Sequence, residues 1–235
     1  MDKVTKVDTE MYMADGTVKK SSQIILVEKE ITVKVVSKTE EICNYVIVCT
    51  DTNIKELVLG RLLTDGIIRD KRDISDFEGN ENGEVIVELN ARYNNSDNAK
   101  PRSIRREYKD YPKEYILKLI EEFSKESALH RMTKSAHSCY LLYRGEIVFS
   151  CEDISRHNAV DKTAGYIFLD DIDPEECIIY TSGRVPLDMI TKVDSVGIPI
   201  LVAKAVPTDR ALQYAFLHKI VLIARARSDS FEVFS

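Results

Sequence analysis

Short apolar segments alternate with helical ones in the C-terminal part of the chain, and this alternation constrains the fold most. Three apolar runs predict strands, at residues 177–181, 200–203 and 221–224. Two helices are predicted between them, at residues 186–193 and 209–218. Continuously apolar strands that alternate with helices are typical of a parallel sheet covered on both faces. We therefore expect an α/β protein.

The sequence upstream predicts a smaller α+β region at residues 23–110, preceded by a loose arm at residues 1–22 that lacks periodicity. Segments with alternating or continuous apolar residues predict three strands, at residues 31–35, 45–49 and 85–89. A helix is expected to begin after Asn53, because Glu56 completes the spacing of a capping box, and to end near Gly66.

A composition break precedes the predicted C-terminal domain, residues 111–235. Residues 93–110 are rich in asparagine and contain a cluster of three arginines, so we predict a mobile loop there. Pro112 then opens a helix with an apolar stripe. Residues 144–145 separate two apolar segments and predict a tight hairpin, so the sheet is expected to be mixed, with flanking helices.

Composition excludes several classes of protein. The chain of 235 residues has 33 Lys and Arg against 39 Asp and Glu, which disfavours a nucleic-acid or membrane-surface binder. No apolar run approaches the roughly 18 residues needed to span a bilayer, and the opening residues lack the apolar core of a signal peptide. Five cysteines without C-x-x-C spacing predict neither a disulfide framework nor a structural zinc site. We expect a cytoplasmic protein without a metal site.

The densest polar segment is residues 152–162, between a predicted strand and a predicted helix. Asp153 or Ser155 can cap that helix, whose first N–H groups would face an anion. Three side chains at its start could donate to a phosphate or a purine edge, namely Arg156, His157 and Asn158. The alternative is a solvated helix start held by salt bridges.

A second candidate is Ser182-Gly183-Arg184, directly after an apolar strand. Ligands of parallel sheets bind at the carboxyl ends of the strands, where Gly183 would allow close approach and Arg184 could hold a phosphate. The alternative is a turn glycine needed only for its backbone conformation. Two further strand ends carry candidate groups, namely Pro207-Thr208 and Arg225 with Arg227. This convergence predicts a polyanionic ligand.

His137 and Cys139 would project to the same side of a strand and could form a thiolate–imidazolium pair. The alternative is a buried cysteine beside a structural histidine. A deaminase zinc site is not supported, because the sequence has neither H-x-E nor P-C-x-x-C.

Taken together, these residues resemble the FdhD family of formate dehydrogenase accessory sulfurtransferases. Residues 56–68 are similar to the family's E-L-A-x-G-F-L-x-x-E-G-I-I, and residues 152–162 to its E-D-V-G-R-H-N-A-V-D-K. Three shorter matches follow in order, at residues 182–184, 197–201 and 207–208. The resemblance implies a cytidine-deaminase-like core.

It further implies a cytoplasmic protein that binds molybdenum or tungsten bis(molybdopterin guanine dinucleotide), which GDP can mimic. Such proteins take sulfur from a cysteine desulfurase and pass it to the cofactor before it enters the formate dehydrogenase apoenzyme. A homodimer is expected only as the usual default for soluble proteins. The resemblance and the strand-end pattern together nominate the cofactor-binding residues Arg156, His157, Asn158, Asp161, Lys162, Ser182, Gly183, Arg184, Lys192, Pro207, Thr208, Arg225, Ala226, Arg227, Ser228, Asp229 and Ser230.

The chain also departs from the family pattern. The family's C-x-x-C, which holds the persulfide, is absent from residues 93–110, and its T-G-G-x-H-A-A has lost both glycines at residues 133–139. Sulfur relay requires a thiolate, so the catalytic role could survive only by relocation, for which Cys139 is the candidate. Three functions therefore stay open. The protein is a sulfur-transferring accessory protein, a non-catalytic carrier or regulator that binds the cofactor, or, third, a nucleoside-modifying enzyme.

Overall fold

The structure is a computed structural model that describes residues 3–38, 40–90, 113–125 and 127–234. The predicted mobile loop at residues 93–110, with its arginine cluster, lies outside the described residues. No helix in the described ranges has the length and apolarity to cross a bilayer.

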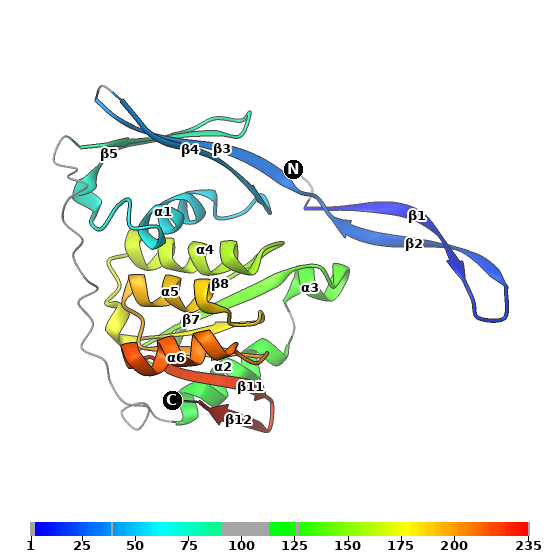
Figure 1. The fold of residues 1–235 in the computed structure, drawn as a ribbon. Coiled ribbons are helices and arrows are strands. Elements are labelled where there is room, and N and C mark those ends of the chain that lie inside the picture. The colour runs from blue at the N-terminus through cyan, green and yellow to red at the C-terminus, as the bar shows by residue number, and fades with distance from the viewer. Residues whose placement is uncertain (1–2, 39, 91–112, 126, 235) are drawn as a thin grey trace.

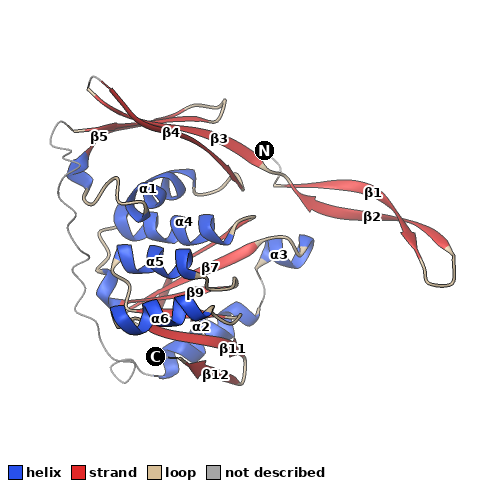
Figure 2. Ribbon diagram, in the orientation of Figure 1, coloured by secondary structure: helices blue, strands red, loops and turns tan. Residues whose placement is uncertain are grey.

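The C-terminal part is built on a six-stranded sheet with the order β12-β11-β10-β9-β7-β8 (Figure 2). Its strands are β7 (His137–Tyr143), β8 (Glu146–Asp153), β9 (Cys177–Thr181), β10 (Ile200–Ala203), β11 (Val221–Arg227) and β12 (Ser230–Val233). The strands β9, β10 and β11 are parallel, whereas β7 runs antiparallel to β9. The expected α/β fold with a mixed sheet is therefore confirmed.

Helices cover both faces of this sheet (Figure 1). One face packs against α4 (Arg156–Leu169), α5 (Leu187–Val196) and α6 (Asp209–His218). The opposite face packs against α2 (Lys113–Ser124), whose Ile116, Leu119 and Ile120 are buried as the apolar stripe predicts. A short helix, α3 (Ala128–Thr133), leads toward β7. Two 3₁₀ turns complete the set, η1 (Lys71–Asp73) and η3 (Pro174–Glu176).

The predicted hairpin at residues 144–145 is confirmed between β7 and β8. Arg144 and Gly145 both have positive φ, 49° and 85°. This conformation matches the two-residue turns whose twist suits antiparallel strands.

The N-terminal part forms a second sheet with the order β4-β3-β6-β5. Its strands are β3 (Lys29–Ser37), β4 (Glu40–Cys49), β5 (Ile74–Gly79) and β6 (Glu84–Leu89), so the three predicted strands exist. Helix α1 (Ile54–Thr64) packs on this sheet and, on its other side, against α4. The predicted helix start after Asn53 is confirmed, since Asn53 is the N-cap of α1. The hydrogen bonds of a capping box are absent, because Asn53 adopts a left-handed conformation and its Nδ2 donates to Glu56 Oε1 at 3.2 Å.

The expectation of a loose arm at residues 1–22 is also wrong. The segment forms an antiparallel hairpin of β1 (Val4–Tyr12) and β2 (Val18–Leu26) that reaches away from the body of the molecule (Figure 1). Most of its side chains are exposed on both faces. Because neither face is buried, the sequence has no need to alternate apolar and polar residues, and the usual strand signal is missing.

Candidate functional site

The turns after β9 and β10 lie side by side at one edge of the six-stranded sheet. Lys204 N donates to Thr181 O at 3.1 Å, and Thr208 N donates to Val185 O at 3.0 Å. A parallel bridge between Val185 and Pro207 joins the two turns. This is the edge where the carboxyl ends of parallel strands meet, as the strand–helix alternation predicts.

A cavity of about 150 Å³ opens at this edge, between α3, the start of β7 and the turns after β9 and β10. Its basic or ionisable side chains are His130, Lys134, His137 and Lys204. Its hydroxyl groups belong to Ser127, Ser135, Ser138 and Ser182. No carboxylate is among the described residues that line it. A cavity of this composition favours an anionic ligand group.

Ser182 connects the two sides of the cavity. Its Oγ accepts the N–H of Ser138 at 3.0 Å and lies 3.2 Å from Nδ1 of His137. The hydroxyl of Ser182 can donate one hydrogen bond and accept two, so it can pair with either tautomer of His137. The hydroxyl of Ser127 lies 2.7 Å from that of Ser138. The cavity wall is thus a connected network of donors.

Electrostatics keeps the histidine of this cavity neutral at pH 7. Burial, followed by the positive charge of Arg156, lowers the pKa of His137 below its usual value. The ammonium group of Lys204 lies 5.5 Å from the centre of the Phe123 ring, which the cation can contact through its π face. Lys204 therefore supplies a fixed positive charge and His137 a neutral donor.

Arg156 begins α4 and lies against Gly183, the residue that follows Ser182, although it is not among the residues that line the cavity. Ser155 caps α4 by accepting the N–H of His157, so it is one of the two predicted caps. A Cβ at Gly183 would lie 2.7 Å from Cδ of Arg156, so Gly183 makes room for this arginine rather than for a ligand. Arg156 Nε is buried and has no hydrogen-bond partner in the described ranges. Because a buried donor without a partner is costly, this position suits an external acceptor.

Two residues nominated as cofactor ligands stabilise the interior of the protein instead. Lys162 Nζ lies 2.8 Å from Asp153 Oδ2, and both side chains have no exposed surface. Asn158 Nδ2 donates to Val48 O at 2.8 Å and to Asp153 Oδ1 at 2.9 Å. These contacts hold α4 against β4 and β8, so the nomination of Asn158 and Lys162 is corrected: neither faces the cavity.

The same correction applies to Asp161 and Lys192. Lys192 Nζ lies 2.8 Å from Asp161 Oδ1 and donates to Thr64 Oγ1 at 2.9 Å. Burial raises the pKa of Asp161, while the charge of Lys192 opposes that rise. The pair joins α4 to α5 and, through Thr64, to α1, and Asp161 has no exposed surface.

The remaining nominated residues lie at the same sheet edge but do not line the cavity. Arg184 and Thr208 are exposed on the two turns, beside Pro207, and His157 Nε2 lies 2.9 Å from Asp188 Oδ2. The β11–β12 turn is separated from β9 by β10, and Arg225 pairs with Glu232. The nominated residues here are Arg225, Ala226 and Arg227 at the end of β11, Ser228 and Asp229 in the turn, and Ser230 at the start of β12, and Ala226 is buried.

The cysteines offer no exposed thiolate. Cys139 is fully buried in β7, and desolvation raises its pKa well above the usual value. His137 lies at the start of the same strand, but its Nδ1 faces Ser182, so Cys139 lacks the expected activation and its candidacy is corrected. Burial also raises the pKa of each other thiol, to about 11 for Cys49, about 12 for Cys151 and Cys177, and to a lesser extent for the half-buried Cys43.

Lys204, His130 and Ser138 line the cavity although the sequence reasoning did not select them. Lys204 directly follows the apolar run of β10, so the strand-end rule that selected Ser182 would have found it. His130 and Ser138 come together only through the path of α3 into β7, for which the sequence carries no comparable signal.

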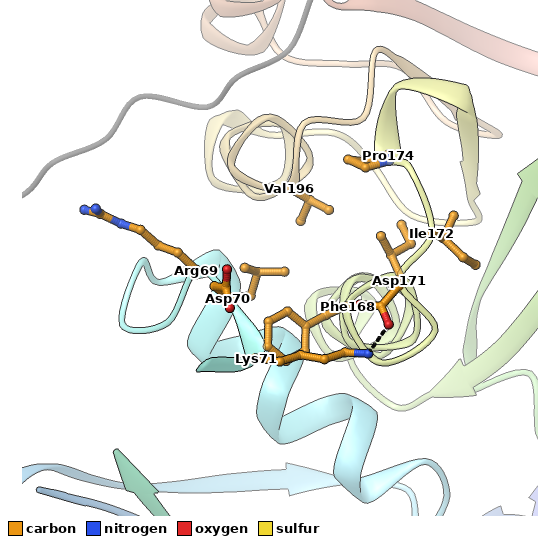
Figure 3. Close-up of a pocket in the computed structure, with 10 residues that line it drawn as sticks. Arg69, Asp70, Lys71, Phe168, Asp171, Ile172, Pro174 and Val196 are labelled. Atoms are coloured by element: carbon orange, nitrogen blue, oxygen red, sulfur yellow. Dashed lines mark hydrogen bonds and ion pairs between the residues drawn. The ribbon is translucent and has the colours of Figure 1, made fainter. Parts of the chain in front are cut away.

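Larger cavities exist but lack this chemistry. One of about 380 Å³ lies at the far end of α4, where Lys71 pairs with Asp171 near Phe168 (Figure 3). Asp70, which also lines this cavity, pairs with Arg72. Another of about 460 Å³ lies between α3, β8 and the residues that precede α1. Within the described ranges, no cluster of three or more His, Cys, Asp or Glu side chains could hold a metal ion.

Comparisons with known proteins agree with the resemblance. A relative from Bacillus subtilis, "Sulfur carrier protein FdhD", is 27% identical across 100% of this chain and 97% of its own. A protein of the same name from Listeria monocytogenes is 29% identical across 80% of this chain and 82% of its own. The fold matches the crystal structure of a putative formate dehydrogenase accessory protein from Desulfotalea psychrophila, with a TM-score of 0.84 and 23% identity over 100% of this chain and 97% of the other.

The family comparison covers the part of the chain that carries the candidate site. The model of the FdhD/NarQ family matches residues 94–235, which include the cavity, α4 and all six strands of the larger sheet. This match extends over more than half of the sequence, so the protein belongs to the FdhD/NarQ family.

Proposed function

We propose that this protein assists the maturation of formate dehydrogenase by binding its bis(molybdopterin guanine dinucleotide) cofactor as cargo. The observation that carries the proposal is the donor-rich cavity together with the buried, unpartnered Nε of Arg156. The names of the relatives, which describe sulfur carriers and a formate dehydrogenase accessory protein, support the same cellular task.

The residues present fit part of that cargo. A cavity of about 150 Å³ is smaller than the roughly 300–1,000 Å³ of most ligand pockets, so it suits one phosphate or the edge of a base. Lys204, His137 and Ser182 would donate to that group, and Arg156 would gain the acceptor that its Nε lacks. The exposed side chain of Arg184 lies on the adjoining turn and would contact the part of the cargo outside the cavity. When bound, the cofactor supplies the metal and its sulfur ligands.

The cysteine environment favours the carrier reading over sulfur relay by this chain. A persulfide forms by attack of a thiolate, but all five thiols have a raised pKa, four of them are buried and Cys43 is half-buried. We therefore propose that the protein binds the cofactor without a cysteine persulfide of its own. A cysteine desulfurase and the formate dehydrogenase apoenzyme remain the proposed neighbours in this task, with sulfur delivered by another carrier.

Titration with GDP tests the binding site. Isothermal titration calorimetry should give a saturable signal that Lys204→Ala weakens by about 1.5–3 kcal/mol, the range for hydrogen bonds to charged groups. Lowering the pH below the ordinary histidine range should strengthen binding, because His137, neutral at pH 7, then gains a positive charge that faces the anion.

Two further variants sharpen this test. Lys20→Ala removes an exposed lysine of the distant hairpin and should leave the affinity unchanged. Gly183→Ala keeps every donor but displaces Arg156, because the new Cβ would lie 2.7 Å from its Cδ, and should weaken GDP as well. Absence of binding at millimolar GDP, or equal affinities for the wild type and Lys204→Ala, contradicts the proposal.

Mass spectrometry tests the absence of a persulfide. After incubation with a cysteine desulfurase and cysteine, we expect no mass increase of one sulfur atom on any of the five cysteines, because none presents an exposed thiolate. The persulfide of the desulfurase itself serves as the positive control in the same sample. A stable persulfide on Cys139 or on another cysteine of this chain contradicts the carrier reading and restores sulfur transfer.

A further inference from the structure

A second cavity adjoins the donor-rich one at α3. It lies between α3, β8 and the residues that precede α1, and its volume of about 460 Å³ is within the roughly 300–1,000 Å³ of most ligand pockets. Ser127 lines both cavities, and its hydroxyl lies 2.7 Å from that of Ser138 in the wall of the donor-rich cavity. A ligand longer than one phosphate therefore has room on both sides of Ser127.

The lining of this second cavity suits a flat ring that carries polar groups on one edge. Its apolar wall is formed by Ala128, Leu129, Met132 and Tyr140. Glu152 is the carboxylate among the described residues that line it, whereas the described lining of the donor-rich cavity has none. An apolar wall with a few polar groups that fix orientation is the usual composition of a small-molecule site.

The carboxylate of Glu152 is held in place by the first turn of α3. Its Oε2 accepts the N–H of Leu129 at 3.0 Å, and its Oε1 accepts the N–H of His130 at 2.9 Å. Each carboxylate oxygen has two lone pairs, so each can accept a second hydrogen bond from a ligand in the cavity.

No cation neutralises this carboxylate within the described ranges. Lys3 also lines the second cavity, but it forms no ion pair with Glu152. Two acceptor oxygens are therefore fixed side by side before any ligand arrives, and they retain their negative charge. Such a group matches a ligand with two adjacent N–H donors, because both hydrogen bonds form without ordering the side chain.

We propose that the second cavity binds the edge that guanine and pterin rings share, a ring N–H beside an amino group, and that Glu152 is the specificity-determining residue that accepts from both. Adenine presents an acceptor nitrogen in place of the ring N–H, so it would face the carboxylate with a like charge. The inference rests on the proposed function, because the guanine and the pterin of the proposed cargo both carry this edge. The phosphates that link them would then lie in the donor-rich cavity.

Calorimetry with four ligands tests the contact to the base. GDP should bind at least about tenfold more tightly than inosine diphosphate, which lacks only the amino group, because a hydrogen bond to a charged group is worth about this factor. ADP should bind no more tightly than inosine diphosphate. Inorganic pyrophosphate, which has no base, should bind in the donor-rich cavity alone.

Glu152→Gln tests the residue itself. The change keeps the size of the side chain but removes its charge and turns one acceptor into a donor. It should bring the affinities for GDP and inosine diphosphate close to each other and leave the affinity for pyrophosphate unchanged, which also shows that the variant is folded. Glu114→Gln, at an exposed position of α2, is the matched control and should keep the preference for GDP.

Free pterin separates the two sources of the shared edge. Pterin has neither ribose nor phosphate, so it should displace GDP from the wild type without displacing pyrophosphate. A preference for GDP over inosine diphosphate that Glu152→Gln abolishes supports guanine as an occupant. Displacement of GDP by pterin that Glu152→Gln also abolishes supports pterin as an occupant of the same cavity.

Other results overturn the inference. These are equal affinities of the wild type for GDP and inosine diphosphate, or an unchanged preference in Glu152→Gln. Loss of pyrophosphate binding in Glu152→Gln would show that Glu152 only holds α3 in place. Failure of the proposed function is different, since the wild type would then bind neither GDP nor pyrophosphate, and both proposals would fall. Failure of the inference alone leaves both ligands bound without a preference for the amino group.

Discussion

Gly165→Ala should lower the free energy of unfolding by about 3 kcal/mol, although the same change inside an ordinary helix raises it by about 1 kcal/mol. A Cβ at Gly165 in α4 would lie 1.9 Å from the carbonyl oxygen of Glu56 in α1. The reciprocal contact is as close, since a Cβ at Gly60 would lie 1.8 Å from Asp161 O. Both obstacles are backbone atoms, so the two helices would have to move apart.

Urea unfolding followed by circular dichroism measures this effect. Gln213→Ala, at an exposed position of α6, is the matched control and should change the stability by less than about 0.5 kcal/mol. Gly60→Ala should act like Gly165→Ala, and the two together should cost less than the sum, because the first change already separates the helices. A stabilised Gly165→Ala protein would show that α1 and α4 are not packed through these glycines.

Much of the fold could be predicted because a buried face requires apolar residues at regular positions in the sequence. The strands β9 and β10 are buried on both faces and read as unbroken apolar runs, whereas Ile31, Val33 and Val35 of β3 alternate with polar residues. The β1–β2 hairpin buries neither face and carries no such pattern. The close contact of α1 with α4 at Gly60 and Gly165 could not be predicted either, since a glycine in a helix does not indicate which backbone packs against it.

The candidate site could be predicted in part for a similar reason. The strand-end rule found Ser182, because the residue after a buried strand lies at the ligand-binding edge of a parallel sheet. Residues 152–162 were harder, because polar side chains that face a ligand and polar side chains buried in ion pairs look the same in a sequence. The structure distinguishes them, because Arg156 Nε is buried without a partner in the described ranges, whereas Lys162 and Asp161 are buried in ion pairs.

Lys162→Met tests that separation and should lower the free energy of unfolding by about 3–5 kcal/mol, the usual cost of breaking a buried ion pair. The change keeps an unbranched side chain as far as Cε but removes the ammonium group, so the carboxylate of Asp153 stays buried without its cation. Lys162 Nζ also donates to Thr50 Oγ1 at 2.9 Å and to Glu152 O at 3.2 Å, so these acceptors lose a partner as well.

The matched control is Lys118→Met, which makes the same substitution in an exposed pair. Lys118 Nζ lies 2.7 Å from Glu146 Oε2, and the two side chains are 42% and 78% exposed, so its loss should cost about 1 kcal/mol or less. Thermal unfolding of both variants gives the comparison, and similar losses would contradict the buried ion pair. A GDP titration of Lys162→Met below its unfolding temperature then separates the two roles of the polar segment. An unchanged affinity for GDP shows that Lys162 has a structural role, whereas a loss of GDP binding in folded protein would show that Lys162 contributes to the ligand site.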